Sequence, residues 1–394
     1  MRLFDQFQRT DYESARYAEP LFTYMNRTAR AEFEEVRNKL EVWFSHYPKP
    51  EQPEIRARFC SDINTQHQSA LFELLLHEIL RVLGCEITPH PTLSNTAKTP
   101  DFLVKPLNGT PFYIEAVLAT NESADEAAAQ ARINTVYDVV DRKVDSSNFF
   151  LWVNVEGSPK SPPSANRIAS FLNKRLAKLD PDQVAILYET GGKDAIPSWR
   201  YEHDGWIVNF QPIPKKPEAR NKKGARPIGA QSTGVHWVDH RTPIRNAINK
   251  KAGRYGELEL PYIVAVNVLE YIDEIDIMEA LFGKEQFTIS FSQGHPLKPV
   301  DTQMSRILDG VWTSHEGPRN TRVSAVLLAT QLSPWRLSSG KVCLYHNPWA
   351  QKSYSSVLTR LPQAVLEDNH MKKVDGESIG SILGLPNSWP TEVG

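Results

Sequence analysis

The segment TPDFLVKPLNGTPFYIEAVLAT, residues 99–120, constrains the fold more than any other part of the chain. Two strand-like runs, 101–106 and 112–119, flank the turn signal Asn108-Gly109, which predicts an antiparallel hairpin. Side chains alternate between the two faces of a strand, and the even positions of the second run are all apolar. The hairpin therefore has one buried face, and Glu115 lies on the other.

The hairpin carries two carboxylates, Asp101 and Glu115. The length of its loop sets the register of the two strands and so determines whether these residues lie opposite each other. A two-residue turn at Asn108-Gly109 would place Asp101 opposite Ala116. A three-residue loop with Gly109 in the left-handed conformation would place Asp101 opposite Glu115, with Cβ atoms roughly 5 Å apart.

Neighbouring carboxylates repel each other and resist burial. A divalent cation between Asp101 and Glu115 would remove both costs, because hard cations take oxygen ligands. The alternative is that both are edge-strand charges, solvated or paired with Lys98 and Lys105.

The segments around the hairpin predict an α/β fold. Helical periodicity covers 67–84 and 123–144, and strand patterns cover 85–91 and 148–157. The order is helix, three strands, helix, strand, which is typical of helices packed on a mixed central sheet. The run 184–190 is expected to form a further strand.

The whole chain divides into four predicted segments. An N-terminal helical segment spans 1–62 and the α/β core spans 63–213. A loop rich in Pro, Gly and basic residues covers 214–234, and a C-terminal α/β extension covers 235–394.

A third carboxylate, Glu73, lies in the apolar helix 67–84. It forms an i, i+4, i+8 stripe with His77 and Arg81. One reading is a solvated stripe, and the other directs Glu73 toward the two carboxylates of the hairpin.

These residues resemble the PD-(D/E)XK nuclease superfamily. Pro100-Asp101 matches the PD element, Glu115 matches the (D/E) position, and Glu73 matches the acidic residue that many members carry on the first core helix. The resemblance implies a restriction-endonuclease-like core in which Glu73, Asp101 and Glu115 hold Mg²⁺ or Mn²⁺. It also implies hydrolysis of phosphodiester bonds, of DNA more than of RNA, in restriction or defence. Other pieces, such as FELLLHEIL and YHNPWA, resemble a group of bacterial proteins.

One position departs from the family pattern, because Val117 stands where the motif has lysine. In the family that lysine positions the attacking water and stabilises charge on the phosphate. Lys98 from the preceding loop, or Gln130 from the following helix, would take over this role. Lys105 shares the face of Asp101 but lies at the edge of reach. The alternative is a nuclease fold that has lost catalysis and binds nucleic acid or a protein partner.

Basic residues in the loop 214–234 are candidates for phosphate contacts, and a solvated linker is the alternative. They are Lys215, Lys216, Arg220, Lys222, Lys223 and Arg226. Further along, Lys250, Lys251 and Arg254 are typical of a solvated helix face, with a contribution to a groove left open. His315 and His346 lack a second ligand at metal spacing, which favours structural roles.

Composition narrows the class of protein. The net charge of −2 argues against a surface coated with phosphate-binding residues, although a local basic groove remains compatible with it. Three distant cysteines and no apolar run of roughly 18 residues predict a cytoplasmic protein that does not enter membranes. No GxxxxGK[ST] loop occurs, which excludes a P-loop motor. Cleavage of both DNA strands would require a homodimer.

Overall fold

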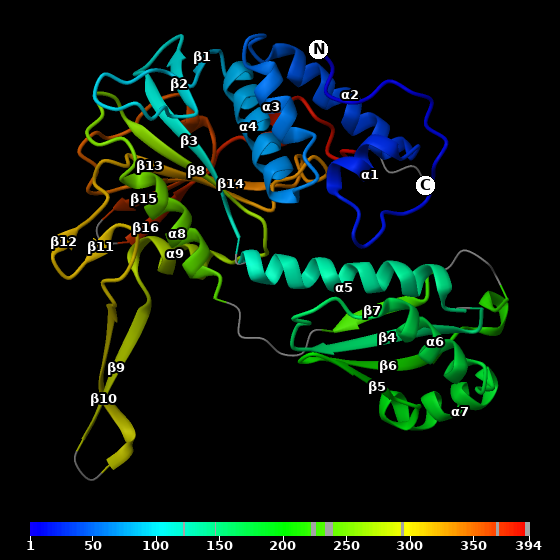
Figure 1. Ribbon diagram of the computed structural model, residues 1–394. Helices are drawn as coiled ribbons and strands as arrows, with labels where there is room; N and C mark the ends of the chain where they lie inside the picture. Colours follow the sequence, from blue (N-terminus) through cyan, green and yellow to red (C-terminus); the bar gives the residue numbers. More distant parts are fainter. Residues whose placement is uncertain are drawn as a thin grey trace. The chain divides into compact units, whose positions relative to one another are not determined.

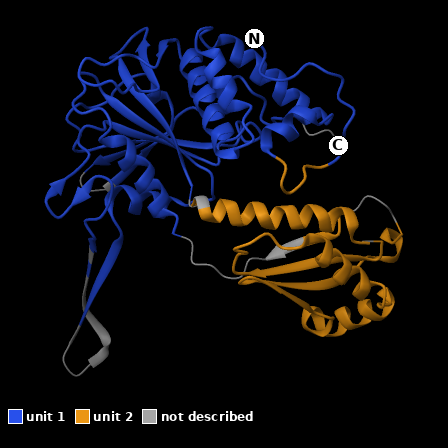
Figure 2. Ribbon diagram, in the orientation of Figure 1, with its two compact units in different colours: residues 1–13, 20–121, 239–394 blue, residues 14–19, 122–238 orange. Residues whose placement is uncertain are grey.

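The computed structural model describes residues 1–120, 123–145, 147–221, 226–232, 239–292, 295–367 and 370–390 (Figure 1). The chain forms two compact units (Figure 2). Unit 1 contains residues 1–13, 20–121 and 239–394, and unit 2 contains residues 14–19 and 122–238. These boundaries differ from the predicted division at 63–213 and 235–394, because unit 2 is inserted into the chain of unit 1.

Unit 1 begins with a group of helices, as the sequence predicts for 1–62. They are α1 (Leu21–Arg27), α2 (Ala31–His46), α3 (Gln52–Phe59) and α4 (Asn64–Val82). Helix α4 is buried along most of its length, including Glu73 and His77. It ends before Gly84, whose φ of +83° is the left-handed conformation that closes many helices.

The core of unit 1 is an eight-stranded mixed sheet. Its strands, in spatial order, are β1 (Cys85–Pro89), β2 (Phe102–Pro106), β3 (Phe112–Ala119), β8 (Tyr262–Val268), β13 (Ala325–Thr330), β14 (Lys341–His346), β15 (Gln363–Glu367) and β16 (His370–Val374). Strands β1, β2 and β3 form an antiparallel meander. Strands β3, β8 and β13 are parallel neighbours, so their carboxyl ends lie at one edge.

Helices cover both faces of this sheet, which explains why every residue of β8 is buried. Ile263 and Ala265 pack in the core on the side of α2 and α4. Val264 and Val266 pack in the core on the side of α8 (Arg241–Ala252) and α9 (Glu274–Phe282). Helix α8 contacts both β3 and β8 and connects them as a crossover.

Short elements complete unit 1. They are the hairpin β9 (Glu285–Ser292) and β10 (His295–Arg306), the pair β11 (Thr313–Ser314) and β12 (Gly317–Pro318), the 3₁₀ turn η3 (Val357–Arg360) and helix α10 (Ile379–Ile382).

Unit 2 has a four-stranded sheet of its own. Its elements are α5 (Ala124–Lys143), β4 (Phe149–Glu156), α6 (Ala165–Leu176), α7 (Pro181–Gly191), η1 (Gly192–Ala195), β5 (Trp199–His203), β6 (Trp206–Pro214), η2 (Pro217–Ala219) and β7 (Ile228–Ser232), with strand order β5-β6-β4-β7. Alternate residues of β4 and β6 pack against α5 and α6 in a separate hydrophobic core.

One prediction of strand pairing and two of local structure are wrong. The run 148–157 forms β4 in the sheet of unit 2, and the strand that follows β3 in the core sheet is β8. The run 184–190 belongs to helix α7, since the Asp180 side chain caps the backbone N–H groups of Asp182 and Gln183. The predicted loop 214–234 contains strand β7.

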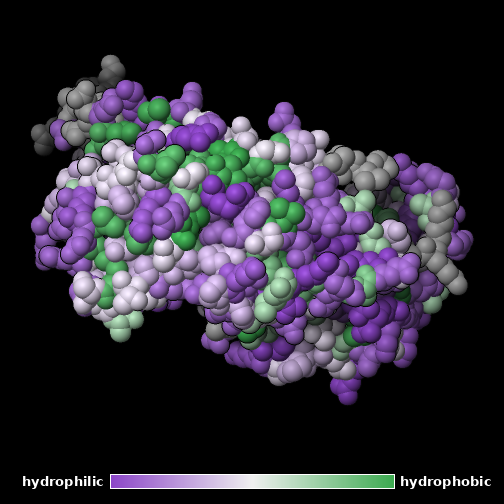
Figure 3. All heavy atoms as spheres, turned by 90° about the horizontal axis from the view of Figure 1, so that it is seen from above, coloured by the Kyte–Doolittle hydropathy of each residue, from purple (hydrophilic) through white to green (hydrophobic). Residues whose placement is uncertain are grey.

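The face of the molecule in Figure 3 is mostly hydrophilic, with smaller apolar areas between polar side chains. Within the described ranges, no helix combines the length and the apolar character that crossing a bilayer requires.

Candidate functional site

Asp101 and Glu115 face each other across two adjacent strands. Phe102 pairs with Ile114, so the same register sets Asp101 opposite Glu115. The Asp101 N–H donates to Glu115 Oε2 at 3.2 Å, and the Ala116 N–H donates to Asp101 Oδ2 at 2.6 Å. The register of the three-residue loop is therefore confirmed, and the one that sets Asp101 opposite Ala116 is wrong.

Glu115 is fully buried and is surrounded by donors from α8 and the residues after it. Lys251 Nζ lies 2.5 Å from Glu115 Oε1, and Arg254 Nη1 lies 3.2 Å from the same oxygen. The Tyr255 hydroxyl lies within hydrogen-bond distance of Glu115 Oε2 and of the Thr99 carbonyl. Burial and the Glu115 charge raise the pKa of Tyr255, which keeps this hydroxyl protonated.

Lys251 supplies the cation that position 117 lacks. Val117 packs against the hydrophobic core on the α8 side of the sheet, where a lysine side chain would be buried. Lys251 reaches the same carboxylate from the crossover helix. The sequence did contain a signal, because Ile244, Ile248, Lys251 and Tyr255 form one i, i+4, i+7, i+11 stripe. A lysine within such a stripe lies on the packed face of the helix, so the interpretation of Lys251 as solvated is wrong.

Asp101 is the most perturbed acid of this site. Burial, followed by the negative charges of Glu115 and Glu73, raises its pKa from 3.8 to about 7, and Lys251 opposes the shift. A carboxyl group with this pKa exchanges a proton near neutral pH, which is the range that general acid–base chemistry uses.

Glu73 is buried and bonded to two residues of the N-terminal helical segment. The Tyr47 hydroxyl donates to Glu73 Oε1 at 2.8 Å, and Arg58 Nη2 donates to Glu73 Oε2 at 2.7 Å. The negative charge of Glu73 contributes to the raised pKa of Asp101. The alternative of a solvated stripe is wrong for Glu73 and for the buried His77, whose pKa burial lowers to about 4.

The other candidates for the role of the missing lysine are exposed or paired with other residues. Lys98 is exposed. Gln130 is an exposed residue of α5 in unit 2, where its amide donates to Asn134 Oδ1 at 2.8 Å. Lys105 pairs with Glu86 at 3.4 Å.

Three of the predicted phosphate-binding residues contact their own unit. The Lys215 ammonium lies over the ring of Phe150, Arg220 pairs with Asp182, and Arg226 pairs with Asp141. Lys216 is exposed. Lys222 and Lys223 lie outside the described residues. Among the histidines, His346 Nε2 lies 2.9 Å from Gln363 Oε1, which confirms a structural hydrogen bond, and His315 is exposed.

The oxygen chemistry of Asp101 fits a hard divalent cation, whereas a cation at Glu115 or at Glu73 would have to displace hydrogen bonds that these carboxylates already accept. Asp101 Oδ1 accepts no hydrogen bond from any described residue, and a nearby positive charge would offset the repulsion that raises its pKa. On Glu115, a cation would compete with Lys251 and Arg254 for Oε1. Both oxygens of Glu73 already accept hydrogen bonds. Across the described part of the chain, no three His, Cys, Asp or Glu side chains form a ready metal-binding group.

Comparison of the chain with protein-family models, with curated proteins and with solved structures finds no match.

Proposed function

We propose that this protein is a divalent-metal-dependent nuclease that hydrolyses phosphodiester bonds, with DNA as its main substrate. The observation that carries the proposal is the buried arrangement of Asp101, Glu115 and Lys251, in which two opposed carboxylates meet a lysine from the crossover helix. The order α4, antiparallel β1-β2-β3, α8, parallel β8 supports a relationship to the PD-(D/E)XK superfamily, with unit 2 inserted before α8.

Each residue has a defined task in this proposal. A bound Mg²⁺ or Mn²⁺ would supply Lewis-acid chemistry that activates water and neutralises charge on phosphate. Asp101 and Glu115 would hold the cation, whose positive charge would lower the pKa of Asp101 and keep it ionised. Lys251 and Arg254 provide positive charge beside the carboxylates, where it stabilises the negative charge that develops on a phosphate. Glu73, bonded to Tyr47 and Arg58, acts on Asp101 through its charge.

A second candidate is a catalytically inactive protein that binds nucleic acid or a protein partner. One observation favours it: Glu115 already accepts hydrogen bonds on both oxygens from protein groups, and its charge is matched by Lys251 and Arg254. In this reading the three residues form a structural ion-pair network with no reaction.

Cleavage assays with matched variants distinguish the two candidates. Plasmid DNA, linear single-stranded DNA and RNA are each incubated with protein in Mg²⁺, Mn²⁺ or EDTA. Metal-dependent cleavage that disappears in Asp101→Asn, Glu115→Gln and Lys251→Met supports the nuclease. Lys250→Met is the control, because Lys250 is the exposed neighbour of Lys251 on the same helix. No cleavage by the wild-type protein, or full cleavage by Asp101→Asn, would refute the proposal.

A further inference from the structure

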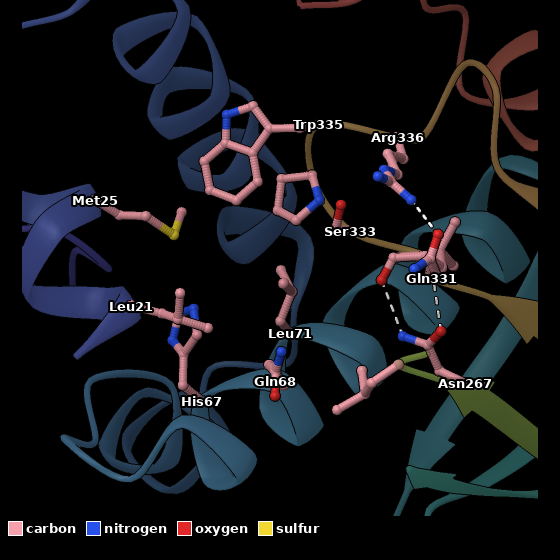
Figure 4. Close-up of a pocket in the computed structure, with 13 residues that line it drawn as sticks. Leu21, Met25, His67, Gln68, Leu71, Asn267, Gln331, Ser333, Trp335 and Arg336 are labelled. Carbon is pink, nitrogen blue, oxygen red and sulfur yellow. Dashed lines mark hydrogen bonds between the residues drawn. The ribbon is translucent and has the colours of Figure 1, made fainter. Parts of the chain in front are cut away.

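A cavity in unit 1 is lined by residues that the proposed reaction does not use. It has a volume of about 200 Å³ and lies where the chain leaves β8 and β13, against α1 and α4 (Figure 4). Carboxyl ends of parallel strands are a recurrent location for ligand sites in α/β proteins. The volume is below the roughly 300–1,000 Å³ of pockets for drug-sized ligands, so the cavity suits one small ring system.

The rim of the cavity is held in place by Asn267 at the end of β8. Its amide donates to the Leu332 carbonyl at 2.9 Å and accepts from the Leu332 N–H at 3.0 Å. The preceding residue, Gln331, has a φ of +50°, a left-handed conformation that a non-glycine residue rarely adopts. Such strain persists where the surroundings fix it, and it is frequent at ligand sites.

Apolar side chains form the walls. Met25, Leu71 and Trp335 surround the open space in Figure 4, and Leu21 closes it on the α1 side. The Trp335 ring offers a flat surface to a ligand, and aromatic rings stack favourably on nucleobases.

Two polar side chains of α4, His67 and Gln68, also line the cavity. His67 is almost fully buried, and its Nδ1 lies 2.5 Å from the Phe59 carbonyl. Since a carbonyl only accepts, Nδ1 carries the proton, and Nε2 is left as an acceptor. Burial lowers the pKa of His67, which keeps the ring neutral. The Gln68 amide is half-buried and has no hydrogen-bond partner among the described residues. This amide edge offers one donor and one acceptor side by side.

A cation lies at the mouth of the cavity. The guanidinium of Arg336 is exposed and donates to Gln331 Oε1. The site thus combines a flat apolar wall, an amide edge, a histidine acceptor and a positive charge at its entrance.

We propose that this cavity binds a single nucleobase, with Gln68 and His67 on the base edge and Arg336 toward an attached phosphate. The choice of a nucleobase among planar heteroaromatic rings rests on the proposed nuclease function. A free nucleotide and an unpaired base of a nucleic-acid strand share this chemistry, and the test separates them.

Isothermal titration of the full-length protein with AMP, adenosine and ribose 5-phosphate tests the base requirement. AMP and adenosine should bind, and ribose 5-phosphate should not. Gln68→Leu should weaken both ligands by about 10-fold or more, since it removes two hydrogen bonds from a buried edge. Gln66→Leu is the matched control, an exposed glutamine on the same helix. Arg336→Gln should weaken AMP and leave adenosine unchanged.

Three results would each overturn the proposal. Ribose 5-phosphate could bind as tightly as AMP, or AMP could fail to bind at millimolar concentration. Gln68→Leu and Gln66→Leu could also lose the same affinity. In the second arm, a single-stranded oligonucleotide is compared with the same strand carrying abasic sites. A loss of affinity at abasic sites that Gln68→Leu abolishes assigns the cavity to a base of the strand, and AMP binding without that loss assigns it to a free nucleotide.

These binding measurements are made in EDTA and do not depend on cleavage. If the protein binds AMP through Gln68 but cleaves no nucleic acid, the nucleobase site stands and the nuclease function is refuted. If the protein cleaves DNA but binds no base, only the nucleobase site is refuted.

Discussion

Replacing Asp101 by asparagine should stabilise the protein at alkaline pH and have no effect on stability in acid. Asparagine resembles the protonated form of aspartic acid and still accepts the hydrogen bond from the Ala116 N–H. The substitution therefore removes the charge that burial, Glu115 and Glu73 oppose, and leaves the backbone contact in place.

The sign and size of the effect follow from the raised pKa. Below about pH 4 the carboxyl group is protonated in both the folded and the unfolded chain, so it contributes no difference. Between pH 4 and pH 7 the unfolded chain releases a proton that the folded protein keeps, so the stability of the wild type falls as pH rises. A shift from 3.8 to about 7, at roughly 1.4 kcal/mol per unit, amounts to about 4 kcal/mol above pH 7.

Urea unfolding of both proteins at pH 4, 6 and 8, in EDTA, measures this difference. The free energy of unfolding of Asp101→Asn should exceed that of the wild type by less than about 1 kcal/mol at pH 4 and by about 4 kcal/mol at pH 8. Asp125→Asn, an exposed aspartate in unit 2, serves as the control. A difference between Asp101→Asn and wild type that is the same at all three pH values would refute the reasoning. Added Mg²⁺ should reduce the difference at pH 8, because it would stabilise only the wild-type charge.

Three further predictions concern the surrounding charges. Lys251→Met should bind Mn²⁺ about 10-fold more tightly than wild type, since the lysine competes for Glu115 Oε1, yet this variant should not cleave DNA. Titration calorimetry measures the Mn²⁺ affinity and a plasmid assay measures the cleavage. Weaker Mn²⁺ binding would contradict the competition. Arg58→Met should lower the free energy of unfolding by about 3 kcal/mol at pH 8, because the buried Glu73 charge then keeps only Tyr47 as a partner. Urea unfolding measures this loss. A loss no larger than that of Arg56→Met would argue against a buried ion pair. Lys216→Gln should reduce the slope of log K against log salt by about 1 in DNA binding, measured by fluorescence anisotropy, and an unchanged slope would exclude Lys216 as a phosphate contact.

The hairpin and the N-terminal helices could be predicted from the sequence because their information is local. Turn chemistry and period-two alternation over 101–119 restrict the register of Asp101 and Glu115 to two choices, and the structure selects one. Helix α4 follows from its apolar periodicity and from Gly84 after its end. The general α/β character, with helices on a mixed sheet, is confirmed for the same reason.

The partner of β3 could not be predicted, because strand pairing is non-local. The runs 148–157 and 261–270 are similarly apolar, and nothing in either indicates which sheet it joins. The shorter separation in sequence favoured the first, and the structure pairs β3 with β8. The site predicted from the sequence lacked Lys251 for the same reason. This lysine is 136 positions from Glu115 and belongs to the crossover helix between β3 and β8.

The insertion of unit 2 between β3 and α8 also affects how this chain is made. A ribosome releases Asp101 and Glu115 early, and must then translate residues 122–238 before Lys251, Arg254 and Tyr255 emerge. Until then the growing polypeptide carries a negatively charged hairpin with a free edge, which is a target for mispairing. Unit 2 has its own core and can complete its folding during this interval. Because of this order of synthesis, the hairpin is complete before the helix that packs on it emerges, and a chaperone that shields strand edges would act on this intermediate.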